Sequence, residues 1–148
     1  MPNNHRPMSG PVKVCAVTLN WKRCDDTLEC LGSLYRSGVE GLEVIVIDNG
    51  SHDGSAERIR QAFPQAFLVV NDRNEGYAKA ANQGIRLALE HGATHILTIN
   101  NDAVGHGAFL RTMMEAFPRH PDAGILGCKI LYYGTDTIWY GGGHFNDL

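Results

Sequence analysis

Apolar and polar residues follow one another along this chain in a pattern that predicts strands and helices in turn. Short apolar runs are followed by longer segments in which apolar residues recur every three or four positions, the spacing of one helix face. The expected strands are 12–18, 42–47, 67–70, 96–99 and 124–131, and the expected helices are 26–38, 55–63, 77–91 and 108–117. Such alternation is typical of parallel strands joined by right-handed crossovers. We therefore expect a doubly wound α/β fold with a mostly parallel sheet and helices on both faces.

The segment 77–91 has the most regular helical pattern. One apolar stripe recurs along it and is expected to face the sheet. The stripe consists of Tyr77, Ala80, Ala81, Ile85, Ala88 and Leu89. Lys79 and Asn82 fall outside this stripe, in the first two turns of the expected helix, and are candidates for contact with a ligand.

Three of the expected strands end in polar residues. The sequence HILTINNDA, residues 95–103, runs from an apolar strand directly into Asn100, Asn101 and Asp102. Two other apolar runs end in the polar segments 18–20 and 48–51. Because open α/β sheets bind ligands at the carboxyl ends of their strands, we expect the three strand ends to form a single site.

The chemistry of these strand ends allows two interpretations each. Asp102 with neighbouring amide oxygens suits Mg²⁺ or Mn²⁺, which combine one or two carboxylates with the phosphate oxygens of a substrate; the alternative is an Asn-rich turn before the next helix. Asp48 and Asn49 are placed to contact a base or ribose, yet Asp-Asn-Gly-Ser is also a favourable turn. Trp21, which follows the first strand, is expected either to contact a ligand or to pack in the core.

Composition and charge exclude several classes of protein. The 148 residues suit one domain, and a net charge of −3 without a basic run argues against a nucleic-acid partner. No run reaches the roughly 20 apolar residues of a membrane helix. Residues 1–11 are expected to be a flexible leader before a single domain at 12–148. The four cysteines lack metal-binding spacing, which favours reduced thiols in a cytoplasmic protein.

Four segments, taken in order, resemble a known enzyme family. They are VCAVTLNW, VIDNGSHDGS, NEGYAKAANQGI and HILTINNDA. Together they resemble the nucleotide-sugar-binding half of family 2 inverting glycosyltransferases of the GT-A type, closest to the rhamnosyltransferase-like branch. The resemblance runs from about residue 14 to 145, with Asn-Asn-Asp in place of the family's D-x-D metal motif.

The resemblance implies a role for each candidate residue. Thr18, Asn20, Asp48 and Asn49 are expected to line the base and ribose pocket. Gly76, Lys79 and Asn82 are expected to close this pocket and approach the phosphates. Asp102, with Asn100 or Asn101 nearby, is expected to hold Mn²⁺ or Mg²⁺ against the diphosphate.

The implied reaction is inverting transfer of a sugar from a dTDP- or UDP-sugar to a hydroxyl of a saccharide or lipid-linked acceptor. A lipid-linked acceptor implies peripheral association with the inner face of a membrane. The family's later carboxylate segment has no counterpart here, so we expect a domain truncated before its acceptor side and assign no general base. Two alternatives stay open: a nucleotidyltransferase, and a receiver-like or nucleotide-sensing module centred on Asp48.

Overall fold

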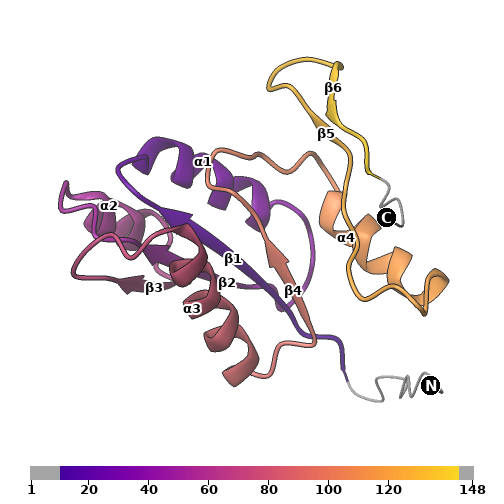
Figure 1. Ribbon diagram of the computed structural model, residues 1–148, viewed down its shortest axis with the longest axis horizontal. Coiled ribbons are helices and arrows are strands. Elements are labelled where there is room, and N and C mark those ends of the chain that lie inside the picture. The colour runs from indigo at the N-terminus through magenta and orange to yellow at the C-terminus, as the bar shows by residue number, and fades with distance from the viewer. Residues whose placement is uncertain (1–10, 144–148) are drawn as a thin grey trace, which may run out of the picture.

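The computed structural model describes residues 11–143, and their core is a four-stranded parallel sheet (Figure 1). Its strands are β1 (Val14–Asn20), β2 (Glu43–Asp48), β3 (Phe67–Val70) and β4 (His95–Thr98), in the order β3-β2-β1-β4. The chain moves from β1 outward to β3 and then returns to the other side of β1 for β4. This reversal creates a switch point between β1 and β4, where open α/β sheets bind ligands. Most of the expected leader, and residues 144–148, lie outside the described residues.

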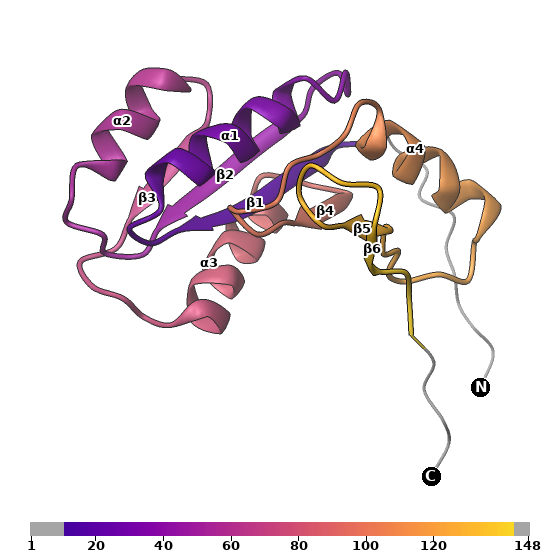
Figure 2. The same ribbon diagram turned by 90° about the horizontal axis from the view of Figure 1, so that it is seen from above.

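Helices cover both faces of the sheet (Figure 2). On one face, α1 (Cys24–Tyr35) and α2 (Ser55–Ala62) pack on Ala16, Val44 and Val46. On the other face, α3 (Tyr77–Glu90) packs on the alternate residues of the same strands, among them Val17 and Ile47. Successive side chains of a strand point to opposite faces, so a strand apolar at every position is buried on both sides. The expected doubly wound α/β fold is confirmed.

The face that α3 turns to the sheet differs from the expected stripe. The buried residues of α3 are Ala80, Gly84 and Ala88, whereas Tyr77 and Leu89 are 61% and 58% exposed. A Cβ placed on Gly84 would lie 2.4 Å from Cγ1 of Val17. Small residues therefore set the contact because the helix lies too close to β1 for larger ones, and the expected burial of Tyr77 and Leu89 was wrong.

The prediction of a fifth strand at 124–131 was also wrong. Only β5 (Ile130–Leu131) is extended there, and it pairs antiparallel with β6 (Ile138–Tyr140) in a separate hairpin rather than joining the sheet. The backbone N–H of Tyr132 donates to the carbonyl of Thr137 at 2.9 Å, a local bond within this hairpin. Ahead of the hairpin, Ile125 is 90% exposed.

The last helix, α4 (Phe109–Ala116), continues into a 3₁₀ turn at Phe117–Arg119 and lies beside β4. A groove of about 800 Å³ separates them and is lined by apolar side chains such as Met113 and Met114. Within residues 11–143, no strand pairs with the edge of β4 that faces away from β1.

Three of the four cysteines belong to the core. Cys15, Cys24 and Cys30 are buried and Cys128 is exposed, all as free thiols. Burial raises the pKa of both Cys15 and Cys30 to about 11, so these two thiols stay protonated at neutral pH and act as small apolar side chains.

The close approach of α3 to β1 predicts that Gly84→Ala destabilises the protein. The added methyl group meets Val17, and overpacking of this kind costs about 1–3 kcal/mol. Urea unfolding followed by circular dichroism measures the change. Gly124→Ala is the matched control, because a Cβ there meets nothing within 4 Å. Equal midpoints for the two variants would contradict the close approach.

Candidate functional site

A buried amide and a buried carboxylate join the ends of β1 and β2. Asn20 and Asp48 are register partners, and Nδ2 of Asn20 donates to Oδ2 of Asp48 at 2.7 Å. The same nitrogen lies 3.1 Å from Oγ of Ser51, whose backbone N–H donates to Oδ1 of Asp48 at 2.9 Å. Both carboxylate oxygens thus have a donor, as a group only 1% exposed requires.

The polar contacts continue from β1 to the segment after β4. The hydroxyl of Thr27, in α1, donates to Oδ1 of Asn20 at 2.8 Å. Nδ2 of Asn101 donates in turn to Oγ1 of Thr27 at 3.0 Å. One hydrogen-bonded chain, Asp48–Asn20–Thr27–Asn101, therefore connects all three polar strand ends.

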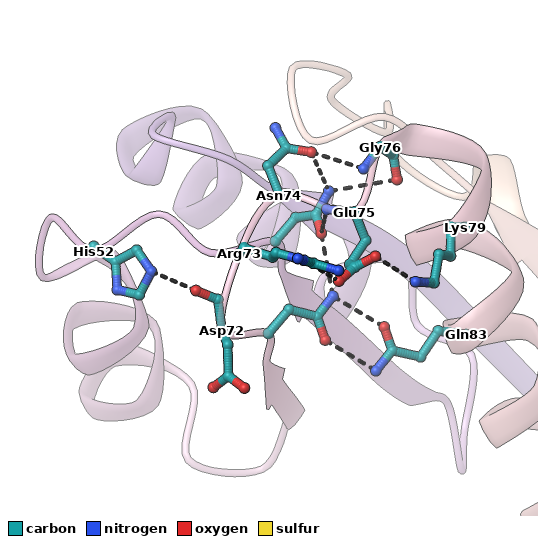
Figure 3. A network of polar contacts seen from close by, with 10 residues as sticks. His52, Asp72, Arg73, Asn74, Glu75, Gly76, Lys79 and Gln83 are labelled. Carbon is teal, nitrogen blue, oxygen red and sulfur yellow. Dashed lines mark hydrogen bonds and ion pairs between the residues drawn. The ribbon is translucent and has the colours of Figure 1, made fainter.

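A second network shapes the loop between β3 and α3 (Figure 3). Oδ1 of Asn49 accepts from Nδ2 of Asn71 and from the backbone N–H of Glu75, both at 3.1 Å, and its Nδ2 donates to Oδ1 of Asn74 at 2.9 Å. Asn71 and Gln83 exchange two amide hydrogen bonds of 3.0 Å each. The end of β2 thereby fixes the loop and ties it to α3.

The loops after β2 and β3 also touch through their backbones. Gly50 has φ +74°, and a Cβ there would lie 2.5 Å from backbone atoms of Arg73, so both its conformation and its contact require glycine. Nε2 of His52 lies 2.7 Å from the carbonyl of Asp72. The two loops therefore form one packed layer at the carboxyl edge.

Gly76 precedes helix α3, which starts at this same edge. It has φ +82° and directly precedes α3, so the unpaired N–H groups of the first turn lie at the carboxyl edge, an arrangement that favours anions. Lys79 forms an ion pair with Glu75, which also pairs with Arg73 at 2.8 Å. Bonds from Lys79 and then Arg73 lower the pKa of Glu75 to about 2. Asn82 is exposed and makes no side-chain hydrogen bond within residues 11–143.

The residues after β4 differ in how they are held. Oδ1 of Asn100 accepts from the hydroxyl of Tyr77 at 3.2 Å, which links this segment to α3. Asp102 is exposed, and its carboxylate makes no hydrogen bond or ion pair within the described part of the chain. It lines a hollow of about 220 Å³ together with Arg23, Asp26, Glu29, Val104 and Tyr133.

The donor set around Asp102 fits a hard divalent cation only if a substrate supplies further ligands. No group of three or more His, Cys, Asp or Glu suited to a metal occurs within residues 11–143. The unpaired carboxylate of Asp102, which follows two amide residues in the sequence, matches the way Mg²⁺ is usually held, by one or two carboxylates plus substrate phosphates.

Burial separates two groups of expected site residues. Thr18, Asn20, Asp48 and Asn49 are all buried, whereas Gly76, Lys79, Asn82, Asn100 and Asp102 are exposed; Asn101 is half-buried. Thr18 lies two residues beyond Ala16, on the face covered by α1, and its hydroxyl has no hydrogen-bond partner among the described residues. The first group is thus part of the framework of the edge, and the second is open to a ligand.

Sequence reasoning missed the residues that connect these groups. They are Thr27, Ser51, Asn71, Asn74 and Gln83. Thr27 lies between Cys24 and Leu31 on the buried face of α1, and a hydroxyl on such a face signals that it has a buried partner. Ser51, Asn71 and Asn74 lie in loops and Gln83 lies on α3, and their residue types alone do not show which partners they bond.

With this geometry in place, comparison with known proteins identifies the family. The family model described as glycosyl transferase family 2 matches residues 14–146, nearly the whole chain. The chain belongs to glycosyl transferase family 2. The expected resemblance is therefore confirmed.

Two relatives show what share of a longer glycosyltransferase this chain covers. The chain is 29% identical over 116 residues to the uncharacterized glycosyltransferase EpsJ of Bacillus subtilis, covering 76% of this chain and 32% of EpsJ. It is 29% identical over 105 residues to the N-acetylglucosaminyl-diphospho-decaprenol L-rhamnosyltransferase of Mycobacterium tuberculosis, covering 66% of this chain and 34% of that enzyme. The chain thus spans about a third of the length of these relatives.

A solved structure shares the fold. The mannosyltransferase from Pyrobaculum calidifontis, solved with GDP-Man and Mn²⁺, matches with a TM-score of 0.57 and 23% identity over 68% of this chain and 30% of that one. In the described part of this chain, no helix combines the length and apolar character needed to cross a membrane.

The second network predicts that Asn49→Ala loosens the loop between β3 and α3. The substitution removes the acceptor of the Glu75 backbone N–H and one of the two acceptors of Asn71, and a polar group left unpaired away from water costs about 1–3 kcal/mol. We expect lower unfolding free energy and faster hydrogen exchange at the Glu75 amide. Asn82→Ala is the matched control, because Asn82 is exposed on α3. Unchanged exchange at Glu75 in Asn49→Ala would contradict the network.

Proposed function

We propose that this chain is the donor-binding part of an inverting glycosyltransferase and binds a nucleoside-diphosphate sugar at the carboxyl edge of β1, β2 and β4. The observation that carries the proposal is the hydrogen-bonded chain Asp48–Asn20–Thr27–Asn101. It joins the polar ends of three strands into one hydrogen-bonded edge, at the switch point of the sheet.

The buried and exposed residues have different roles in this proposal. Thr18, Asn20, Asp48 and Asn49 form the floor of the base and ribose pocket, and the side-chain hydrogen bonds of Asn20, Asp48 and Asn49 hold the floor rigid. A rigid floor lowers the entropy lost on binding. The exposed residues Gly76, Lys79 and Asn82 close the pocket over the ligand.

The phosphates lie against the start of α3. The first N–H groups of a helix bind anions through their hydrogen bonds and through the helix dipole, and Gly76 brings backbone close to the ligand without a side chain. Lys79 exchanges its present partner, Glu75, for a phosphate oxygen. Its ion pair is exposed, so the exchange costs little.

Asp102, with the side-chain oxygens of Asn100 or Asn101, holds Mn²⁺ or Mg²⁺ against the diphosphate. When bound, the ion supplies Lewis-acid stabilisation of the charge that develops on the leaving nucleoside diphosphate. The free carboxylate of Asp102 supports this assignment, and so does the Mn²⁺ present with GDP-Man in the similar mannosyltransferase.

The acceptor is a hydroxyl that attacks the anomeric carbon from the face opposite the diphosphate and inverts it. A saccharide on a lipid carrier is the acceptor class that the mycobacterial relative's name supports, and dTDP- or UDP-sugars are the donor class. A lipid-linked acceptor would place the protein in the cytoplasm, at the inner face of a membrane. No residue of this chain is assigned as the general base.

The alternative functions fit less well. A receiver-like module needs an accessible aspartate, yet Asp48 is buried with both carboxylate oxygens bonded. A nucleotidyltransferase needs a phosphate loop after β1, and the turn there holds Trp21, Lys22 and Arg23 without a glycine.

Calorimetric titration with UDP, dTDP and GDP, each with and without Mn²⁺, tests the proposal. We expect one nucleotide to bind in preference to the others and Mn²⁺ to tighten its binding about tenfold or more, a gain of about 1.4 kcal/mol or more. Absence of binding to all three nucleotides would overturn the proposal for this chain.

The metal assignment has its own test in Asp102→Ala. We expect this variant to bind the preferred nucleotide equally with and without Mn²⁺, because the only carboxylate of the proposed metal site is gone. Asp122→Ala, which removes an exposed carboxylate from a turn after α4, should keep the full metal effect. An Asp102→Ala protein with undiminished metal dependence would refute the assignment.

A further inference from the structure

Glu75 binds two basic side chains next to the start of α3 (Figure 3). Its Oε1 accepts a hydrogen bond from Nε of Arg73 at 2.8 Å, and its Oε2 forms an ion pair with Nζ of Lys79. Each carboxylate oxygen therefore has a cation of its own. Hydrogen bonds from Lys79 and from Arg73 lower the pKa of Glu75 to about 2, so the carboxylate is charged at neutral pH.

The backbone that carries these charges is fixed to the carboxyl edge of the sheet. The N–H of Glu75 donates to Oδ1 of Asn49 at 3.1 Å. A Cβ on Gly50 would lie 2.5 Å from backbone atoms of Arg73, so Arg73 lies against the loop that follows β2. The carboxylate and its two cations are therefore part of the edge at which the donor is proposed to bind.

The carboxylate is less exposed than the cations that it binds. The side chain of Glu75 is 24% exposed, whereas those of Arg73 and Lys79 are 80% and 66% exposed. In the ion pair between Arg60 and Glu57 on α2, by contrast, the acid is 68% exposed. At the edge the two cations are thus open to an incoming ligand, while the acid that neutralises them is partly covered.

A carboxylate and a phosphate bind basic side chains through the same chemistry. Both present anionic oxygens to N–H donors in short, charge-assisted hydrogen bonds. Lys79 is proposed above to bind a phosphate oxygen of the donor, and Arg73 is bound to the same carboxylate as Lys79. A diphosphate that binds to these two cations must therefore take the place of Glu75.

We propose that Glu75 is an internal anion that competes with the diphosphate of the donor for Arg73 and Lys79. The inference rests on the proposed function, because the ligand and the edge are the same, and it adds Arg73 to the phosphate contacts. The competition limits the affinity for a nucleoside diphosphate. After sugar transfer, Glu75 binds the two cations again as the nucleoside diphosphate leaves.

Glu75→Gln tests this competition. Glutamine keeps the length of the side chain and the backbone bond to Asn49 but removes the charge that holds Arg73 and Lys79. The probe is whichever of UDP, dTDP and GDP binds the unmodified chain most tightly, titrated calorimetrically with Mn²⁺ present. Because exposed ion pairs are weak, we expect Glu75→Gln to bind this probe about three- to tenfold more tightly.

Asp72→Asn is the matched control. Asp72 is an exposed residue of the same loop, and its charge acts on Arg73. Among the described residues its carboxylate has no ion-pair partner within 4.0 Å, as the carboxylate of Glu75 has. Asp72→Asn removes the same charge from the same loop without releasing a bound cation, so we expect the affinity of the unmodified chain.

The unmodified chain provides a second measurement that needs no substitution. The N–H at Nε of Arg73 donates to Glu75, so its NMR signal reports on this bond. We expect the same nucleotide, added with diamagnetic Mg²⁺, to shift this signal and to leave that of Arg60, on α2, in place.

Four results would overturn the inference. Two of them leave the proposed function standing: nucleotide binding by Glu75→Gln no tighter than by the unmodified chain, or an Arg73 signal that does not respond to a bound nucleotide. Equal tightening in Asp72→Asn would show general charge repulsion in place of competition for the cations. Failure of both the unmodified chain and Glu75→Gln to bind any of the three nucleotides would overturn the proposed function as well.

Discussion

The hydrogen bond between Asn20 and Asp48 is the contact on which the carboxyl edge depends. A carboxylate only 1% exposed is tolerated because Asn20 and the backbone of Ser51 supply donors at 2.7 and 2.9 Å, and hydrogen bonds to a buried charge are worth about 1.5–3 kcal/mol each. Satisfying this charge fixes the ends of two adjacent strands and the first turn of the following loop. The contact of Asn20 with Thr27 starts from the same pair, and Asn49, which bonds the loop before α3, directly follows Asp48.

Polar contacts continue from the ends of β1 and β2 in two directions. Toward β4, Thr27 and Asn101 extend the chain of contacts across the switch point of the sheet. Toward α3, Asn49 fixes the loop between β3 and α3, and Tyr77 returns from α3 to Asn100. The two series of contacts end at the neighbouring residues Asn100 and Asn101 after β4, so buried side chains support exposed ones on both sides of the edge. Preorganisation of this kind is what a site for a charged ligand requires.

The sequence predicted the architecture well because the signals for it are local. Apolar runs such as LEVIVI and the helical period of 77–91 specify strands, helices and their alternation without knowledge of neighbours. The sequence predicted less well the contacts between segments that are far apart along the chain. Gly84, not Tyr77 or Leu89, faces the sheet because α3 lies so close to β1. Of the segment 124–131 only Ile130–Leu131 is extended, in a hairpin with β6, and this was missed because the partner of a strand cannot be read from its own pattern. Likewise, the exposed site residues lie in segments that resemble family motifs. The supporting roles of Thr27 and Gln83 become clear only from their hydrogen-bond partners in the structure.

Within residues 11–143, the outer edge of β4 pairs with no other strand. Backbone N–H and C=O groups that point outward from an edge strand are a template for another strand, and the apolar groove beside α4 lies alongside them. Two copies of this chain that paired along β4 would gain backbone hydrogen bonds and apolar contacts together. Such pairing would increase with protein concentration and with salts that strengthen apolar contacts.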